Sequence, residues 1–240
     1  IELGIHGWKP YPVTEIHRRK YGDCKDKASL LVALLREAGI PANLALVRTA
    51  NLGDIVDEPP SMLLFNHAIA YVPSLDLFLD GTAEQSGAFE LPPLDQGAIT
   101  LVVGAHGGHV SSRLARIPLQ PANANLNVSD YVLTLAQDGT LAVRGQERFR
   151  GQANAGERRN FADAATRRET LQRHLGQIMP GAQVTKLDVA DLSLSSEELG
   201  YTFEASLPRR AVVEGDSSLT MQVSLYPHDL TGNYADRSTR

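Results

Sequence analysis

The stretch Tyr21-Gly22-Asp23-Cys24-Lys25-Asp26-Lys27 stands directly before an apolar run that covers residues 28–38. This order places the only cysteine of the chain in the first turn of a helix, with Asp23 as the N-cap and Gly39 as a natural C′ residue. The run is apolar on nearly every side, so we expect a buried central helix. Unpaired backbone N–H groups and the positive end of the helix dipole favour a thiolate at such a position.

A histidine and an aspartate follow on two strand-like segments. His67 lies near the start of residues 66–72, and Asp80 closes residues 77–80. The Pro-Ser-Leu-Asp sequence between the segments is typical of a hairpin connection. If position 72 pairs with about position 76, His67 lies opposite about position 81 and therefore beside Asp80. The spacing thus predicts a contact between the His67 ring and the Asp80 carboxylate.

The residues around the cysteine also have a plain structural interpretation. An isolated cysteine is often a buried hydrophobe. The polar and charged neighbours of Cys24 argue against burial in an apolar pocket, so we favour a nucleophile. We interpret Asp23 and Asp26 as capping residues and solvated charges of a first helical turn.

The histidine and the aspartate have alternatives as well. His67 alone is typical of a histidine buried in a protein core. Asp80 precedes a glycine, and the Asp-Gly pair is common in turns, so Asp80 is alternatively a turn residue. A zinc site formed by Cys24, His67 and Asp80 is a weak alternative, because paired ligands at zinc-binding spacing are absent. We therefore expect no metal and no cofactor.

The composition excludes several classes of function. The chain has 240 residues and a formal net charge of -5, which gives no electrostatic case for binding nucleic acid. Its longest apolar runs are far shorter than the roughly 20 residues of a membrane-spanning helix. A single cysteine forms no internal disulfide. Because the chain begins with Ile1, we expect a piece of a longer protein.

The remaining sequence predicts two domains, at residues 1–117 and 118–240. The first ends with a strand at 99–103 and a loop at 104–109. In the second, alternating apolar residues flank Asp138-Gly139, the strongest hairpin signal of the chain. A helix is expected over 156–178, where apolar residues recur at helical spacing, and period-two strands over 201–207 and 219–225.

The motifs Gly22-Asp23-Cys24-Lys25-Asp26-Lys27-Ala28, Asn66-His67-Ala68 and Leu79-Asp80-Gly81-Thr82 resemble the transglutaminase-like superfamily, and bacterial members in particular. The resemblance covers roughly residues 1–105. It implies an α+β, papain-like core in which a cysteine helix packs on an antiparallel sheet, followed by a second, β-rich α+β domain. It also implies a catalytic triad of Cys24, His67 and Asp80.

Further expectations come from the resemblance alone. An aromatic or glutamine side chain upstream of the cysteine serves as a second oxyanion donor in such proteins, and Trp8 and Tyr21 are the candidates here. Helices and a β-rich domain that normally precede the core are missing, so the core is expected to be truncated at its N-terminus and to contact that missing domain. An extracytoplasmic location, in the periplasm or cell envelope, is also implied.

The lead hypothesis is thiol-dependent acyl transfer or hydrolysis on peptide or protein carboxamides, of the transglutaminase, amidase or protease type. Cys24 would act as the nucleophile, His67 as its acid and base, and Asp80 would orient the ring. The alternative is a peptide- or cell-envelope-binding module that keeps the fold without turnover. A redox-sensing thiol is a third, weaker hypothesis.

Overall fold

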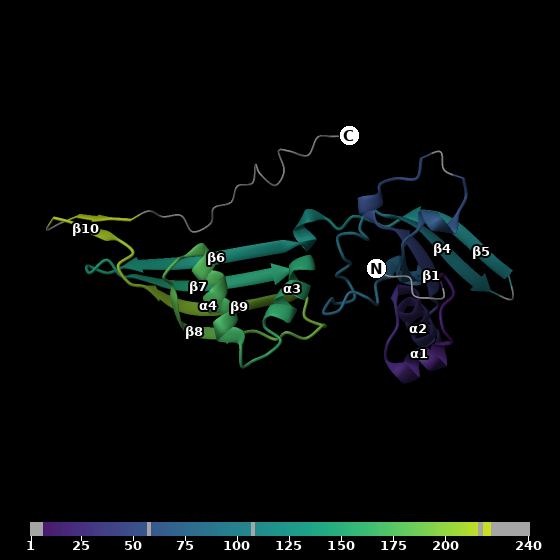
Figure 1. Ribbon diagram of the computed structural model, residues 1–240, viewed down its shortest axis with the longest axis horizontal. Helices are drawn as coiled ribbons and strands as arrows, with labels where there is room; N and C mark the ends of the chain where they lie inside the picture. The colour runs from purple at the N-terminus through teal and green to yellow at the C-terminus, as the bar shows by residue number, and fades with distance from the viewer. Residues whose placement is uncertain (1–6, 57–58, 107–108, 216–217, 222–240) are drawn as a thin grey trace. The chain divides into compact units, whose positions relative to one another are not determined.

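The computed structural model describes residues 7–56, 59–106, 109–215 and 218–221. The chain divides into two units, drawn with separate sheets in Figure 1. Unit 1 comprises Ile1–Leu126, Phe149–Gly156 and Ser193–Glu198, and unit 2 comprises the rest. The α+β class with a β-rich C-terminal part is confirmed, and the expected boundary between 117 and 118 stays a prediction. No helix within the described ranges is long and apolar enough to cross a bilayer.

Unit 1 is built on a five-stranded antiparallel sheet in the order β3-β2-β1-β4-β5. Its helices and strands are α1 (Val13–Arg19), α2 (Cys24–Glu37), β1 (Asn43–Arg48), β2 (His67–Val72), β3 (Leu77–Leu79), β4 (Ile99–His106) and β5 (His109–Arg116). Short 3-10 turns occupy Ala50–Leu52, Met62–Leu64, Pro73–Leu75 and Ala122–Ala124. The cysteine helix therefore belongs to an antiparallel α+β unit, as expected.

The central strands of this sheet are buried on both sides. Every residue of β2 is buried. One cluster joins Ala45, Val47, Ile69, Tyr71 and Phe78 to residues of the β4–β5 pair and its two flanks. A second cluster joins Val32 of α2 to Ala70 and Val72 of β2. The second cluster fixes α2 against β2, which begins at His67.

The first turn of α2 is capped as the sequence predicts, because the Asp23 side chain accepts a hydrogen bond from the backbone N–H of Asp26. The expected burial on nearly every side is wrong. Leu34 is 53% exposed. It belongs to an apolar hollow of about 340 Å³ over α1 and α2, lined by Ile16, Lys20, Tyr21, Gly22, Lys27, Leu30, Leu31, Leu34 and Gly81. The helix thus packs on the sheet through one side only.

Two of the charged residues after the cysteine, Lys25 and Asp26, are buried, which corrects the interpretation of Asp26 as a solvated charge. Asp26 is 2% exposed and accepts bonds from Arg19 Nη2 and from the Tyr11 backbone N–H, each at 2.9 Å. Lys25 is 4% exposed and pairs with Asp23. A Cβ at Gly22 would lie 2.5 Å from the Asp26 Cβ, so only glycine fits at this position of the motif.

The β2–β3 hairpin differs by one residue from the predicted pairing. Val72 pairs with Leu77 rather than with position 76. The reason is local, because the connection forms a 3-10 turn over Pro73–Leu75 and ends at Asp76 in the left-handed region, with φ of 47°. The loop is therefore one residue longer than the prediction assumed. Asp80 lies just beyond the last paired residue, Leu79.

The segment after position 103 is also different from the prediction. Gly104 and Ala105 continue β4 and pair with Ser111 and Val110 of β5, so the expected loop over 104–109 is wrong in this part. Residues 107 and 108 lie outside the described residues. The sequence missed β5 because it is an edge strand whose side chains are mostly exposed and do not alternate in polarity.

The second sheet has four strands in the order β6-β7-β9-β8. They are β6 (Leu126–Leu135), β7 (Leu141–Arg150), β8 (Gln183–Val189) and β9 (Glu198–Leu207), and α4 (Arg167–Ile178) packs on β8. Two short strands, β10 (Val212–Glu214) and β11 (Ser218–Thr220), form a separate pair. The Asp138-Gly139 turn joins β6 and β7 as predicted, with Gly139 at φ of 78°. Positions 222–225 of the last expected strand lie outside the described residues.

The single helix expected over 156–178 is two helices, α3 (Gln152–Asn160) and α4. Between them, Asp163 Oδ1 accepts a hydrogen bond from the Ala165 backbone N–H, and the Asp163 carbonyl accepts one from the Thr166 N–H. These local bonds replace helical ones and form a turn. The apolar spacing alone did not reveal the break.

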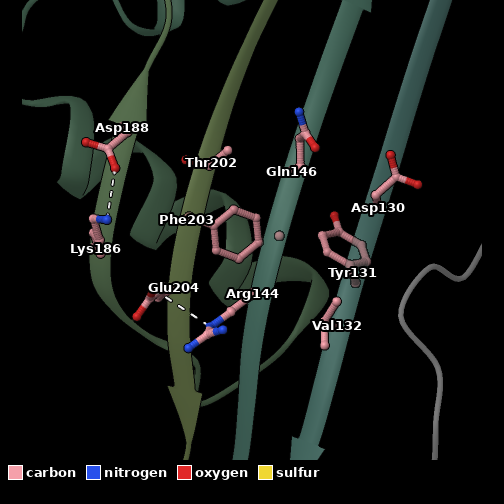
Figure 2. Close-up of a pocket in the computed structure, with 11 residues that line it drawn as sticks. Asp130, Tyr131, Val132, Arg144, Gln146, Lys186, Asp188, Thr202, Phe203 and Glu204 are labelled. Atoms are coloured by element: carbon pink, nitrogen blue, oxygen red, sulfur yellow. Dashed lines mark ion pairs between the residues drawn. The ribbon is translucent and has the colours of Figure 1, made fainter.

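One close approach shapes the face of this second sheet. Phe203 of β9 is 3% exposed, and a Cβ at Gly145 of β7 would lie only 2.2 Å from its ring. Figure 2 shows the Phe203 ring among the surface side chains of neighbouring strands, with ion pairs between Lys186 and Asp188 and between Arg144 and Glu204. The glycine makes room for the aromatic ring.

Candidate active site

Cys24 is the first residue of α2 and is 2% exposed. It packs with Ala28 and Ala68, and half-buried Leu44 and Leu46 adjoin this cluster. The expectation that polar neighbours in sequence would keep the sulfur out of an apolar environment is therefore wrong. The reason is that the neighbouring charges are satisfied by one another, while the start of α2 is pressed against the sheet. Any reaction at this sulfur requires a local opening of the site.

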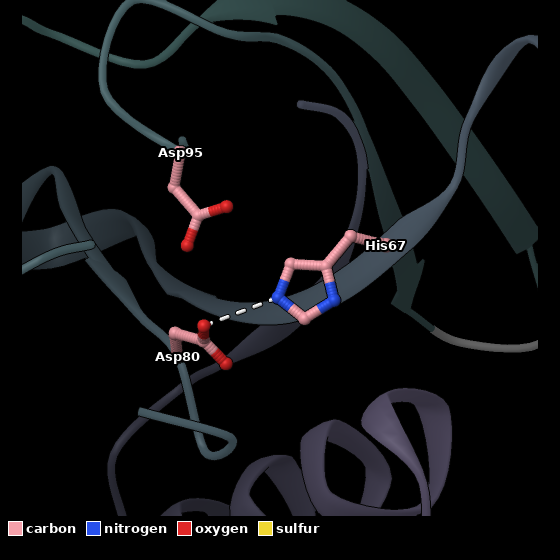
Figure 3. Close-up of side chains that lie close together, drawn as sticks. All are labelled: His67, Asp80 and Asp95. Atoms are coloured by element: carbon pink, nitrogen blue, oxygen red, sulfur yellow. Dashed lines mark hydrogen bonds and ion pairs between the residues drawn. The ribbon is translucent and has the colours of Figure 1, made fainter. Parts of the chain in front are cut away.

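His67 begins β2 and is 1% exposed. The preceding Asn66 fixes the entry of the strand, because its side-chain oxygen accepts bonds from the backbone N–H and hydroxyl of Thr49 at the end of β1. The His67 Nε2 atom lies 3.1 Å from Asp80 Oδ2 (Figure 3). The predicted His67–Asp80 contact is confirmed, despite the shifted register.

Asp80 is held in place by the turn that follows it. The Thr82 backbone N–H and hydroxyl each donate to Asp80 Oδ1 at 2.7 Å. Burial opposes ionisation of this carboxyl group, but the hydrogen bond and positive charge of His67, together with the Thr82 bonds, lower its pKa below the ordinary value. Asp80 is thus a buried, ionised group that accepts hydrogen bonds on both of its carboxylate oxygens.

The protonation of His67 is set by three acidic neighbours. Burial by itself would lower the pKa of the ring, but it is outweighed by the hydrogen bond to Asp80, the hydrogen bond to Cys24 and the negative charges of Asp80 and Asp95. The pKa of His67 is raised to about 10. His67 Nδ1 is buried without a hydrogen-bond partner of ordinary geometry among the described residues. The ring is therefore an imidazolium at neutral pH, with Cys24 near enough to influence it.

Asp95 is the member of the site that sequence reasoning missed. It is 2% exposed, and its carboxyl group is directed toward the His67–Asp80 pair (Figure 3). Burial, and to a smaller extent the charge and hydrogen bonding of Asp80, raise the pKa of Asp95 to about 7, against the opposing charge of His67. In the sequence it lies in the irregular segment before β4, where an acidic residue carries no signal of its own.

These three residues are also the group that could hold a metal ion in the described part of the chain. One ligand atom from each of His67, Asp80 and Asp95 lies within 4.8 Å of the others. Cys24 is not among them, so the zinc alternative suggested by the sequence does not match the geometry.

The two candidate oxyanion donors lie in different surroundings. The Trp8 indole Nε1 is buried and has no hydrogen-bond partner among the described residues. Tyr21 is 77% exposed, and its backbone carbonyl accepts a bond from Arg19 Nε at 2.8 Å. The roles of Trp8 and Tyr21 stay predictions.

The geometry defines a class of site: a buried cysteine at a helix N-terminus beside a histidine that is paired with a carboxylate. Residues 4–73, which include Cys24 and His67, match the family model of the Transglutaminase-like superfamily, so the chain carries a domain of that superfamily in this region. Comparison with curated proteins and with solved structures gave no match.

Proposed function

We propose that the protein catalyses thiol-dependent acyl transfer or hydrolysis on peptide or protein carboxamides, with Cys24, His67 and Asp80 as the triad. The observation that carries this proposal is the buried His67–Asp80 pair, which keeps the ring protonated beside the only cysteine. A charged imidazole stabilises a neighbouring thiolate and supplies the proton that a leaving amine needs.

The proposed reaction has two halves. The Cys24 thiolate attacks the carboxamide carbon, and the C–N bond breaks as the leaving nitrogen takes the proton of His67. In the second half, water or an acceptor amine attacks the thioester while His67 accepts its proton, and the Cys24 thiolate leaves. Asp80 keeps the ring in one orientation throughout.

The oxyanion formed in each half also needs hydrogen-bond donors. The Cys24 backbone N–H belongs to the first turn of α2, where amides lack partners within the helix, so it is available for this role. The buried indole N–H of Trp8 is the second candidate donor, because it has no partner among the described residues.

A second candidate function is favoured by the burial of the sulfur. Because Cys24 is 2% exposed and packs with Ala28 and Ala68, a peptide- or cell-envelope-binding module without turnover would also account for the site. The two candidates differ in whether the sulfur becomes accessible in the folded protein.

The test uses a glutamine-containing dipeptide as carboxamide donor and monodansylcadaverine as acceptor, with the wild-type protein, Cys24→Ala and the surface control Ser74→Ala. We expect ammonia release by the wild type and by Ser74→Ala and none by Cys24→Ala. Incorporation of the fluorescent amine would assign transamidation, and ammonia release alone would assign hydrolysis. Equal, background release by all three proteins would favour the binding module.

The extracytoplasmic location and a contact with a further, preceding domain belong to the same proposal. The apolar hollow over α1 and α2 offers such a domain a surface, with Tyr21 77% and Leu34 53% exposed. Cell fractionation tests the location directly.

A further inference from the structure

Asp95 is the one buried acid of the site that the proposed reaction does not use. It is 2% exposed, its Oδ2 atom has no hydrogen-bond partner among the described residues, and it reaches within 4.8 Å of ligand atoms of both His67 and Asp80. A polar atom buried without a partner costs free energy, so this group needs an explanation.

Two ionised carboxylates side by side in a buried site would repel each other. Asp80 is the one that ionises, because His67 and Thr82 both donate hydrogen bonds to it. The charged groups that act on Asp95 are His67 from β2 and Asp80 after β3. A proton retained by Asp95 removes the repulsion and provides the missing hydrogen bond, since a protonated carboxyl group is a donor.

We propose that Asp95 is a positioning residue, which in its protonated form donates its carboxyl hydrogen to Asp80, so that Asp80 stays directed at His67. This inference extends the proposed function and rests on it, because positioning Asp80 matters for catalysis only if Cys24, His67 and Asp80 form the triad. Asp95 touches neither substrate nor sulfur in this scheme. It acts through Asp80, and Asp80 acts through the His67 ring.

Backbone hydrogen bonds hold the segment around Asp95 in place, which restricts the motion of its carboxyl group. The Asp95 N–H donates to the Pro92 carbonyl at 3.0 Å, and the Asp95 carbonyl accepts from Ala98 N–H at 3.2 Å. The Leu94 carbonyl accepts from Ala50 N–H at 2.7 Å, which ties the segment to the chain just after β1. A donor fixed in this way loses little conformational entropy when it bonds to Asp80.

A divalent cation bound by His67, Asp80 and Asp95 is the competing explanation. It would have to displace the 3.1 Å contact between His67 Nε2 and Asp80 Oδ2, because that nitrogen would become the metal ligand. A hydrogen bond from protonated Asp95 to Asp80 leaves the His67–Asp80 contact intact, so we favour this explanation over a bound cation.

The first experiment measures the protonation state of the Asp95 carboxyl group. Carboxyl-carbon NMR of the ¹³C-aspartate-labelled chain, assigned with Asp95→Asn, should show Asp95 protonated at about pH 5 and titrating near neutral pH. The Cys24→Ala variant should give the same titration, because no step of the reaction is involved. An ionised Asp95 carboxylate at about pH 5 in the folded protein would overturn the inference and leave the proposed function standing.

The second experiment tests the positioning role by the rate of Cys24 alkylation with iodoacetamide. Asp95→Asn presents an N–H donor to Asp80 and should stay within about threefold of the wild type, whereas Asp95→Ala should fall at least about tenfold. Asp188→Asn is the matched control on the surface of unit 2 and should equal the wild type. A loss in Asp95→Asn as large as in Asp95→Ala, or a change in the wild-type rate on adding EDTA, would overturn the inference.

Discussion

Asp80 reaches the His67 ring from just beyond the end of β3, with Oδ2 3.1 Å from Nε2, while the last paired residue of that strand is Leu79. The position of the carboxylate is therefore set by the turn after β3, in which Thr82 donates hydrogen bonds to Asp80, and not by strand pairing. A shift of one residue in strand register normally turns a side chain to the other face. Here the contact tolerates the shift because Asp80 lies outside the paired region.

Replacing Asp80 by Asn tests what its charge does. The amide keeps the shape but removes the charge and the strong hydrogen bond that raise the pKa of His67. We expect the pKa of His67 to fall and the rate of Cys24 alkylation at neutral pH to drop at least about tenfold. Histidine-ring NMR and intact-mass spectrometry measure the two effects. Asp76→Asn, the same change on the same hairpin at a residue bonded to the Tyr71 hydroxyl, is the control and should react like the wild type.

The raised pKa of His67 also predicts a pH dependence of stability. A ring whose pKa is about 10 in the folded protein, against an ordinary value of 6.5 in the unfolded chain, adds stability that is complete below pH 6.5 and is lost as the pH rises through 10. The stability difference between wild type and His67→Gln should therefore shrink between these limits, by at most about 5 kcal/mol. Urea unfolding followed by circular dichroism measures it, and a difference that does not change with pH would refute the ion pair.

The buried Asp26 predicts a structural effect near the cysteine. Its carboxylate accepts bonds from Arg19 and from the Tyr11 backbone, so Asp26→Asn should cost about 1–3 kcal/mol of unfolding free energy. Arg19 also lies 3.8 Å from Glu15, a more exposed partner. Glu15→Gln is thus the matched control and should change the free energy by less than about 0.5 kcal/mol. Equal effects of the two variants would contradict the buried role of Asp26.

Two glycines of the C-terminal half give a paired prediction. A methyl group at Gly145 would meet the Phe203 ring at 2.2 Å, so Gly145→Ala should destabilise the protein by about 1–3 kcal/mol. Gly156 lies in α3 with no atom within 4 Å of an added Cβ, so Gly156→Ala should stabilise it by up to about 1 kcal/mol. Thermal unfolding of the two variants checks the signs, and effects of the same sign would contradict the packing of Phe203.

The parts of the site that the sequence predicted are those set by local rules. The N-cap at Asp23 and the approach of His67 to Asp80 follow from one helix start and one short hairpin. The presence of Asp95 in the site could not be predicted. Its position beside His67 and Asp80 depends on long-range contacts of the segment before β4, such as the hydrogen bond from Ala50 N–H to the Leu94 carbonyl. The burial of Cys24 and Asp26 was missed for the same reason. Asp26 is paired by Arg19 of α1, and Cys24 is covered by residues of the sheet, so both depend on contacts outside the helix.

The most direct test of the account is the pH dependence of Cys24 alkylation by iodoacetamide in the native protein, where the single cysteine makes every adduct unambiguous. Held beside an imidazolium, the sulfur should react at about pH 6 within about threefold of its rate at about pH 8. A rate that instead rises about tenfold per pH unit toward about 8.5, as for an unperturbed thiol, would contradict the account. Reaction only after unfolding in urea would contradict it equally.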